Sequence, residues 1–359
     1  MKNIKNLMIF FVLSLCLSCN EDESSDNSFS VPNLISSQVE QQILPAVNNF
    51  VDASSALNAA VTSYTNETTE NNLLVARNEW KNTVAAYENV YTFNIGEVRE
   101  NFLHLIIYPW PITTEAIENI IIENAEINQE VIDNLSPRAK TFAALEYLLF
   151  KRDLVSTNTE FLTSSKRLTY LQFTADYISS LSLRMHDVWS PEGNNYASRL
   201  ISNRETGIDG SFNLFFNGIY NAIDTGKVTK IGKPAGLENS SVTNAELTQA
   251  HFSNNSLSLL KSSITSIENA YFNEDGIGID DYVLSLTKTD DLNNAVEEKI
   301  NAVYTAIDAI TTNLVTAIDN EPQLVSTLHS KLDDLRIVFG VDMRSILSIV
   351  ITSTDNDGD

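Results

Sequence analysis

The sequence predicts an all-α protein. Glycine and proline are scarce, with 12 and 8 copies in 359 residues, and this favours long uninterrupted helices over a turn-rich β-structure. Apolar residues recur every three or four positions along most of the chain, as they do on the buried face of an α-helix. Apolar side chains make up 43% of the residues, so the chain can bury a sizeable core as one large or two moderate domains.

The chain opens with a segment typical of a bacterial lipoprotein signal peptide, residues 1–18. A lysine-containing start precedes the apolar stretch Leu7–Leu17, which is too short to span a bilayer comfortably. Ser18 before Cys19 resembles a lipobox, although the usual aliphatic position holds Cys16. We expect lipidation at Cys19, and two or three acyl chains would anchor the protein stably in the outer membrane. An ordinary secretory signal is the alternative.

Residues 19–34 predict a flexible acidic tether. The stretch Asn20–Ser30 is rich in acidic residues and serine and poor in apolar ones, a composition that does not form a packed core. An acidic patch directly after a lipidated cysteine resembles the export signal of surface lipoproteins. The protein is therefore expected to face the periplasm or the cell surface.

Composition excludes several kinds of partner and site. The formal net charge is −24, and such an acidic surface repels nucleic acid. Cys16 and Cys19 are the two cysteines of the chain. The folded body therefore has no disulfide, no cysteine nucleophile and no thiolate metal site.

The apolar pattern places the helices. The first half is expected to form helices over residues 35–63, 68–92, 137–151 and 160–189. Pro45 lies in the first turns of the first of these or kinks it, and Ser136 before Pro137 is a plausible N-cap. In the second half, apolar stripes predict helices over residues 257–271, 292–314 and 324–338.

Four stretches depart from this pattern. Residues 91–96 and 344–351 are the best strand candidates, and both are short. The stretch 96–115 contains Tyr-Pro-Trp-Pro and cannot continue a helix, and 226–240 carries three glycines and a proline. The last two are expected to be loops, where functional residues often lie.

Glu146 is the acidic residue of the apolar segment AKTFAALEYLLF. On a helix, apolar residues surround it. Burying a carboxylate costs several kcal/mol unless a partner compensates. Either Glu146 lies at a solvated edge, or a partner meets it. Lys230 or Lys233, from the glycine-rich stretch, could be that partner, and Glu146 would then stay ionised with a lowered pKa.

The same segment resembles the GLPALEYLLF-type sequence of imelysin-like proteins. Further resemblances follow in the family's order: Trp80 before an aromatic-rich helix and Gly96, the Trp-Pro element at Ile107–Pro111, and Lys230–Gly236 after Asn217. The ending Ile351–Asp359 is similar to that of Bacteroidetes members. The resemblance spans residues 35–359.

This resemblance implies two helical bundles, over residues 35–190 and 191–352, followed by an acidic tail at 353–359. It also implies a site between the bundles that contains the family's G-x-H-x-x-E signature. Glu146 takes the acidic position of that signature, but Thr141 stands at the glycine position and Ala143 at the histidine position. Histidine and glutamate three residues apart share a helix face and could bind one metal. Alanine has no ligand atom, so a metallopeptidase site is doubtful here.

The candidate binding residues are those of this implied site together with unusual side chains near it: Glu146, Thr141, Trp110, Lys230, Lys233, His104, His251, Ser253 and Asn217. Glu146 is also the candidate metal ligand and, in an enzyme, the candidate catalytic residue. Each has a plainer interpretation. Trp110 could fill the core at a chain reversal, the two histidines could be structural, and Glu146 could simply fix how the bundles dock.

Three functions remain open from the sequence. The first is a non-catalytic, outer-membrane lipoprotein that binds a small ligand or a metal ion and serves iron or metal uptake, with iron or another divalent metal as the possible cofactor. The second is a metal-dependent peptidase, as the family resemblance implies. The third is a module that binds glycans or proteins at the surface.

Overall fold

The computed structural model describes residues 29–124, 126–352 and 354–355. In this part of the chain the secondary structure is helical, and the β-pairing is one isolated bridge between Glu238 and Ser240. The all-α class is therefore confirmed, whereas the strands expected at 91–96 and 344–351 do not form. No helix within these residues is long and apolar enough to cross a membrane. The expected signal peptide and Cys19 lie outside the described residues.

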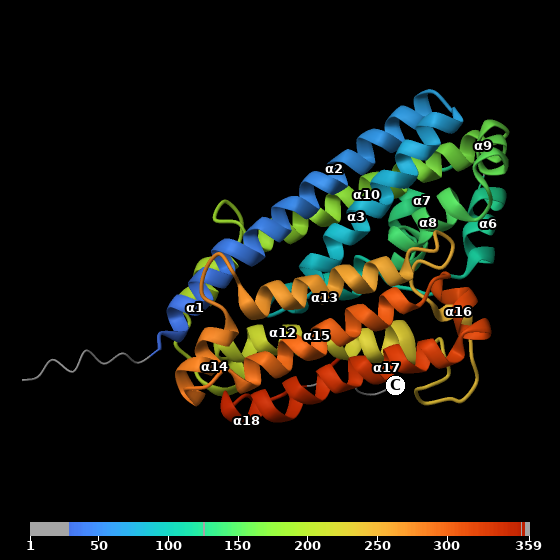
Figure 1. Ribbon diagram of the computed structural model, residues 1–359. Helices are drawn as coiled ribbons and strands as arrows, with labels where there is room; N and C mark the ends of the chain where they lie inside the picture. Colours follow the sequence, from blue (N-terminus) through green and yellow to red (C-terminus); the bar gives the residue numbers. More distant parts are fainter. Residues whose placement is uncertain (1–28, 125, 353, 356–359) are drawn as a thin grey trace, which may run out of the picture.

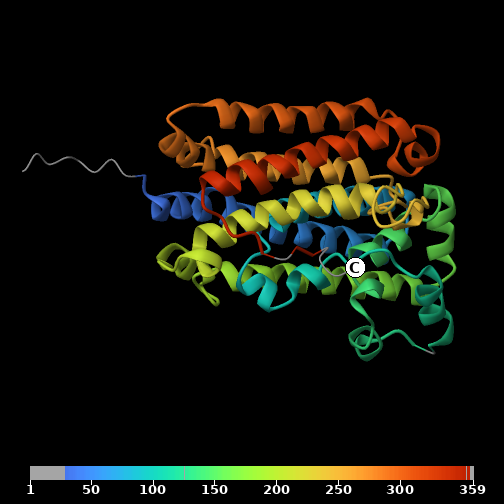
Figure 2. The same ribbon diagram turned by 90° about the horizontal axis from the view of Figure 1, so that it is seen from below.

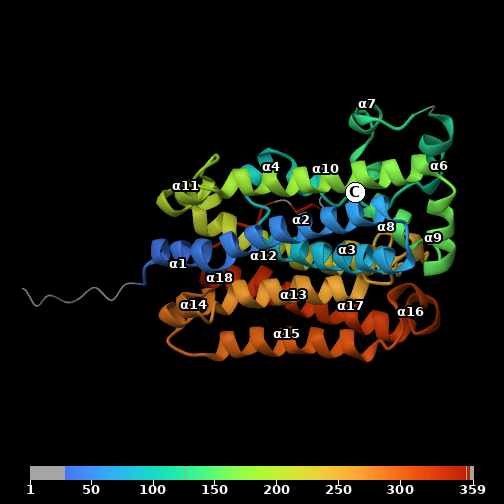
Figure 3. The ribbon, with the colours of Figure 1, turned by 90° about the horizontal axis from the view of Figure 1, so that it is seen from above.

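The long helices form two layers (Figure 1). One layer contains α2 (Leu44–Asn66), α3 (Glu70–Tyr91) and α10 (Ser165–Trp189), and the other contains α12 (Ser211–Thr225), α13 (Ser256–Phe272), α15 (Asp291–Ala309) and α17 (Pro322–Ile337). Seen from above, α13 lies beside α3 and joins the two layers (Figure 3). The helices α6 (Thr114–Glu123), α7 (Gln129–Asp133), α8 (Phe142–Phe150) and α9 (Leu154–Leu162) gather at one end.

Shorter elements make up the rest of the described helical structure. The remaining α-helices are α1 (Val31–Gln38), α4 (Glu97–Glu100), α5 (Leu103–Ile106), α11 (Tyr196–Ser202), α14 (Ile279–Thr287), α16 (Leu314–Asn320) and α18 (Arg344–Ile346). Three π-helical segments, η1 (Val39–Ile43), η4 (Gly226–Gly232) and η6 (Val338–Met343), and three 3₁₀ segments, η2 (Pro137–Ala139), η3 (Gly207–Asp209) and η5 (Ala245–Leu247), complete the chain.

The first helix changes its hydrogen-bond pattern just before Pro45. The π-helical segment η1 separates α1 from α2, and Pro45 is the second residue of α2. Proline has no N–H to donate, so a local change from α to π pairing at this point removes little hydrogen bonding. The proline therefore lies inside a continuous helical run from Val31 to Asn66, at the π-helical segment, and not in the first turns of a helix as expected.

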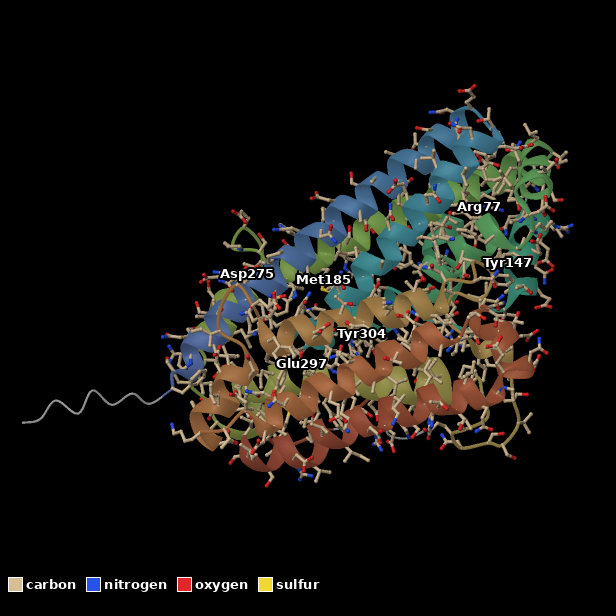
Figure 4. All side chains as sticks on the ribbon, viewed as in Figure 1. Arg77, Tyr147, Met185, Asp275, Glu297 and Tyr304 are labelled. Atoms are coloured by element: carbon tan, nitrogen blue, oxygen red, sulfur yellow. The ribbon has the colours of Figure 1, made fainter. Side chains whose placement is uncertain are left out.

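Apolar side chains from both layers form one continuous core, which extends in sequence from Leu34 to Ile349. Trp80 and Trp189 are completely buried in it. Polar contacts line its margin. Figure 4 shows Tyr304 where α15 faces α13, and the Tyr304 hydroxyl donates to Glu268 at 2.6 Å. Figure 4 also labels Arg77 on α3, which donates to the Leu149 carbonyl at the end of α8 at 2.7 Å.

Two helix boundaries differ from the prediction. Pro137 opens the short 3₁₀ segment η2, and α8 begins later, at Phe142, because Thr141 is extended with φ −127° and ψ −158°. The predicted helix over 160–189 is divided between α9 and α10. Ser164 begins α10, because its hydroxyl caps the N–H of Arg167.

The stretch 226–240 is only partly a loop. Its first seven residues form η4, which continues α12 directly. A side chain at Gly226 would approach Leu260 of α13 to 3.3 Å. Glycine therefore serves close packing at this position rather than a turn, and the loop prediction was wrong for this part.

Candidate ligand-binding site

Glu146 is buried on α8, with 3% of its surface exposed. Its Oε1 atom accepts two hydrogen bonds from Ser253, one from the backbone N–H and one from the hydroxyl, both of 2.8 Å. Ser253 lies just before α13, so this contact joins the first and second halves of the chain. The apolar surroundings of Glu146 are thus compensated by hydrogen-bond donors.

Burial raises the pKa of Glu146 to about 7, although the hydrogen bonds from Ser253 act in the opposite direction. The expectation of a lysine partner and a lowered pKa was therefore wrong. Lys230 pairs instead with Glu88 of α3, with 2.5 Å between Nζ and Oε2.

The start of α8 fixes the position of Glu146. The Thr141 hydroxyl donates to the Pro137 carbonyl at 2.8 Å, which holds the turn before the helix. Trp80 of α3 donates its indole N–H to the Phe142 carbonyl at 3.1 Å. All residues of α8 except the last are buried. Thr141 is therefore a structural residue that sets the start of the helix.

Glu146 also orders the turn that leads into α13. The Ser253 hydroxyl reaches the Ala250 carbonyl at 3.2 Å, and Ser256 donates to the Gln249 carbonyl at 2.5 Å. The Gln249 side chain then donates to Glu88 Oε1 at 2.8 Å. Glu146 therefore positions Gln249 through the turn that Ser253 belongs to.

A cavity of about 400 Å³ lies beside this turn. This volume is within the range of small-molecule sites. Helix α3, the segment around α5, the α12–η4 helix and the turn before α13 all contribute to its wall. The lining residues include Tyr87, Glu88, Tyr91, His104, Leu105, Tyr108, Trp110, Arg138, Thr225, Thr229, Lys230, Lys233, Leu247, Gln249 and Asp355.

The ion pair of Glu88 and Lys230 forms one wall of the cavity. Their side chains are 1% and 5% exposed. Buried charges are retained only when they are paired and hydrogen-bonded, and Gln249 supplies an additional donor to Glu88. The pair therefore places fixed charge on the cavity surface without leaving either group isolated.

Asp355 provides a second acidic group in the cavity. Its carboxylate accepts hydrogen bonds from Arg99 at 2.5 Å, Tyr91 at 3.0 Å and Asn221 at 2.9 Å. Burial alone would raise the pKa of Asp355, but the hydrogen bonds from Arg99 and Asn221 outweigh it and lower the pKa. Asp355 is therefore ionised at neutral pH.

His104 faces Asp355 and is neutral. Its Nε2 atom lies 4.0 Å from Asp355 Oδ1. Burial and the nearby charge of Arg99 lower the pKa of His104 to about 4, despite the opposing charge of Asp355. At neutral pH the ring can therefore offer one donor and one acceptor.

Several buried polar atoms of cavity-lining residues make no hydrogen bond to a described residue, among them the Tyr108 hydroxyl, His104 Nδ1 and Gln249 Oε1. Tyr108 stays protonated because burial, and secondarily the charges of Glu146 and Glu88, raise its pKa. Buried polar groups in folded proteins nearly always have a hydrogen-bond partner. A polar occupant of the cavity could therefore pair with these atoms once small side-chain rotations bring them to the cavity surface.

A row of asparagines on α12 bonds the segment that carries Asp355 and so places Asp355 at the cavity. Asn213, Asn217 and Asn221 are four residues apart and share one face of the helix. Asn213 bonds both the N–H and the carbonyl of Val350, at 2.8 and 3.1 Å. Figure 2 shows the segment after α18 running beside α12.

The other two asparagines continue this pattern. Asn217 accepts from the Thr352 N–H at 2.8 Å, and Asn221 accepts from the Asp355 N–H at 2.9 Å. Asn217 also donates to the Val350 carbonyl at 2.9 Å. The row, defined as Asn213, Asn217 and Asn221, is called the asparagine ladder below.

Comparison with known proteins identifies the family. The family model for imelysin, described as Peptidase_M75, matches residues 43–336. The chain belongs to the imelysin family. No curated protein sequence matches it.

Two solved structures have the same fold. An iron-regulated protein A precursor from Parabacteroides distasonis has a TM-score of 0.71 at 20% identity, with 88% of this chain and 94% of that chain covered. An imelysin-like protein from Psychrobacter arcticum has a TM-score of 0.75 at 14% identity, covering 90% and 96% of the two chains.

The imelysin peptidase description raises the question of a catalytic metal. A catalytic zinc needs three protein ligands and an open position. Across residues 29–124, 126–352 and 354–355, no three His, Cys, Asp or Glu side chains gather as a metal site. The Glu146 carboxylate already accepts hydrogen bonds from Ser253, and Ala143, one turn before it, has no ligand atom. Glu146 lines neither this cavity nor the second cavity described below. The residues around Glu146 therefore do not fit a metal.

The structure separates the two candidate histidines. His251 lines a second cavity of about 750 Å³, where the centre of its ring lies 3.8 Å from that of the Phe252 ring. Burial lowers the pKa of His251. His104, Trp110, Lys230 and Lys233 instead share the first cavity. Trp110 is partly buried and donates to the Leu247 carbonyl at 3.2 Å, so it fills space and lines the cavity at once.

Sequence reasoning missed several residues of this imelysin site: Glu88, Tyr91, Arg99, Tyr108, Asn213, Asn221, Gln249 and Asp355. The ladder carried a signal, because an asparagine at every fourth position of an otherwise apolar helix marks one polar stripe. Asp355 carried none, since it belongs to the segment expected to be an acidic tail.

Proposed function

We propose that this imelysin-family protein is a non-catalytic binding protein of the cell envelope, with a small polar ligand held in the cavity between α3, the α5 segment and η4. The observation that supports it most directly is the set of buried, unpartnered polar atoms of Tyr108, His104 and Gln249 around a volume of about 400 Å³. A wall fixed by helices and ion pairs needs little ordering on association, which favours binding.

A role in iron or metal uptake is part of this proposal. One structural neighbour is described as an iron-regulated protein A precursor. Because the described residues bring no metal cluster together, the role we propose is capture of a small molecule associated with metal uptake rather than direct coordination of an ion by Glu146. Coordination at Glu146 would contradict this, and metal analysis of the purified protein measures it.

Anchoring through a lipidated Cys19 completes the proposal. It is supported by the lipobox-like Ser18-Cys19 after an apolar stretch. A Cys19→Ala variant is expected to lose labelling by a radioactive fatty acid and to leave the membrane fraction. Equal labelling of the variant and the native protein would contradict lipid anchoring, without bearing on the cavity.

Binding in the cavity is tested with Trp110, which lines it, as a fluorescent reporter. A panel of small polar metabolites and ferric chelates is screened for quenching, and each hit is confirmed by native mass spectrometry. Leu105 lines the cavity and is 53% exposed, so Leu105→Trp should narrow the cavity at its rim and abolish binding. Leu286→Trp, at an exposed site on α14, is the matched control.

We expect the native protein and the control variant to retain one ligand per chain, and Leu105→Trp to retain none. Equal binding by all three proteins would place the ligand elsewhere and overturn the proposal. Hydrolysis of a protein substrate that Glu146→Gln abolishes would overturn its non-catalytic part.

A further inference from the structure

Asp355 occupies a site built for a carboxylate. Its three donors come from three separate elements: Tyr91 at the end of α3, Arg99 in α4 and Asn221 in α12. An arginine, a phenol and an amide are strong donors to a carboxylate, and a charged donor makes the bond stronger. We call this set, Tyr91, Arg99 and Asn221, the carboxylate subsite.

The segment that carries Asp355 is held mainly by its backbone. The asparagine ladder bonds main-chain groups of Val350, Thr352 and Asp355. The Val350 side chain is 43% exposed, and Ile351 is only partly buried. Because Val350 is exposed and Ile351 only partly buried, this segment can separate from α12 at a lower cost than a fully buried core helix could.

The charge around the subsite is unusual for so acidic a chain. The formal net charge is −24, yet the cavity wall carries Arg138, Lys230 and Lys233. Glu88 balances Lys230. With Asp355 withdrawn, the carboxylate subsite would present the positively charged Arg99 to the cavity. Such a cavity attracts an anion in spite of the overall charge.

Residues that line the cavity also carry polar atoms without a hydrogen-bond partner. Tyr108 can donate one further hydrogen bond, and His104 Nδ1 and Gln249 Oε1 are also unpartnered. A ligand that bears a carboxylate together with further polar groups would have such atoms within the wall of the same cavity. Asp355 itself bonds none of them.

We propose that the ligand of the cavity is a small molecule bearing a carboxylate, and that it takes the place of Asp355 on Tyr91, Arg99 and Asn221. This inference rests on the proposed function, because it names the chemical class of the ligand. Residues 350–352 and 354–355 act as an internal competitor: their attachment keeps the Asp355 carboxylate at a high effective concentration, so removal of that carboxylate increases affinity.

The test uses succinate as the probe and succinamide as its neutral counterpart, with Trp110 fluorescence and calorimetry as readouts. Asp355→Ala is expected to bind succinate at least about ten-fold more tightly than the native protein, because effective concentrations of tethered groups reach the millimolar range. Asp342→Ala, at an exposed position on η6, should behave like the native protein. Adding Arg99→Met to Asp355→Ala should remove binding.

A second measurement needs no variant. Saturating succinate is expected to accelerate hydrogen exchange at the backbone amides of Val350 and Thr352 in the native protein, because displacement of Asp355 frees the segment. Unchanged exchange at saturation would overturn the displacement.

The remaining outcomes are decisive as well. Succinate binding by Asp355→Ala that is no tighter than native binding would overturn the proposal. Equal affinity for succinamide would overturn the carboxylate class while leaving ligand binding in the cavity intact. In the Asp355→Ala background, Leu105→Trp should reduce succinate binding. If it does not, succinate binds outside the cavity, and the proposal is overturned.

Discussion

The burial of Glu146 makes the stability of the protein depend on pH. Its pKa is about 7 in the folded protein, compared with 4.5 for an unperturbed glutamate. Between these pH values the folded state holds one more proton than the unfolded chain. The free energy of unfolding therefore falls as the pH rises from about 4.5 to about 7, and the contribution of Glu146 is constant above that range.

The size of this change in unfolding free energy follows from the difference between the two pKa values. Each pH unit of difference in pKa corresponds to about 1.4 kcal/mol, so the loss of stability amounts to about 3 kcal/mol. Glu146→Gln keeps an oxygen that can accept from Ser253 but does not titrate. Relative to the native protein, the variant is therefore expected to gain about 3 kcal/mol in unfolding free energy between pH 4.5 and pH 8.

Urea unfolding at pH 4.5, 6, 7 and 8 measures this difference, with tryptophan fluorescence as the signal. For a chain of this length, about 3 kcal/mol also corresponds to a change of about 4 °C in Tm, from the usual unfolding entropy per residue. Glu274→Gln, at an exposed position, is the control and should follow the native protein at every pH. A difference between Glu146→Gln and the native protein that stays constant with pH would refute the reasoning.

Three further perturbations test the surrounding structure. Lys230→Met should lower the unfolding free energy by about 3–5 kcal/mol, because it leaves the buried Glu88 charge unpaired. Adding Glu88→Gln should restore much of the unfolding free energy measured in urea. If the double variant is no more stable than Lys230→Met, the two residues are not energetically coupled. Asn217→Ala removes the hydrogen bonds to Val350 and Thr352. Hydrogen exchange at the Thr352 amide should therefore accelerate, whereas exchange at the Leu260 amide in α13 should not change. If the Thr352 amide exchanges at the native rate, the ladder does not hold this segment. Gly218→Ala places a methyl group 2.5 Å from the Thr92 carbonyl and should lower the unfolding free energy by about 1–3 kcal/mol through overpacking. Urea unfolding measures this against Ser258→Ala, at an exposed position.

The sequence predicted the helices well because their apolar stripes report burial directly. The stripe from Leu292 to Leu314 became α15 and α16, and that from Leu324 to Val338 became α17. Boundaries were less reliable. At Pro137 and Thr163 they depend on single backbone conformations and caps, which local hydrogen bonds decide and apolar periodicity does not show.

The site was predicted only in part. The burial of Glu146 could be anticipated because its neighbours in sequence are apolar, but its partner could not. Ser253 was a candidate binding residue, but it lies 107 residues away, and nothing in the sequence indicated that it would bond Glu146. Lysine seemed the better partner on charge alone. In the structure Lys230 pairs with Glu88 instead, a residue that the sequence did not single out.

The asparagine ladder sets an unusual rule for sequence variation. Its bonds to Val350 involve only main-chain groups, so the identity of the side chain at position 350 matters little. At position 352 the threonine hydroxyl also donates to Asn217, at 3.1 Å. Proline at either position would remove the N–H that Asn213 or Asn217 accepts. Substitutions at position 350 should therefore be tolerated for almost every residue type except proline, whereas position 355, which places a charge in the cavity, should tolerate few replacements.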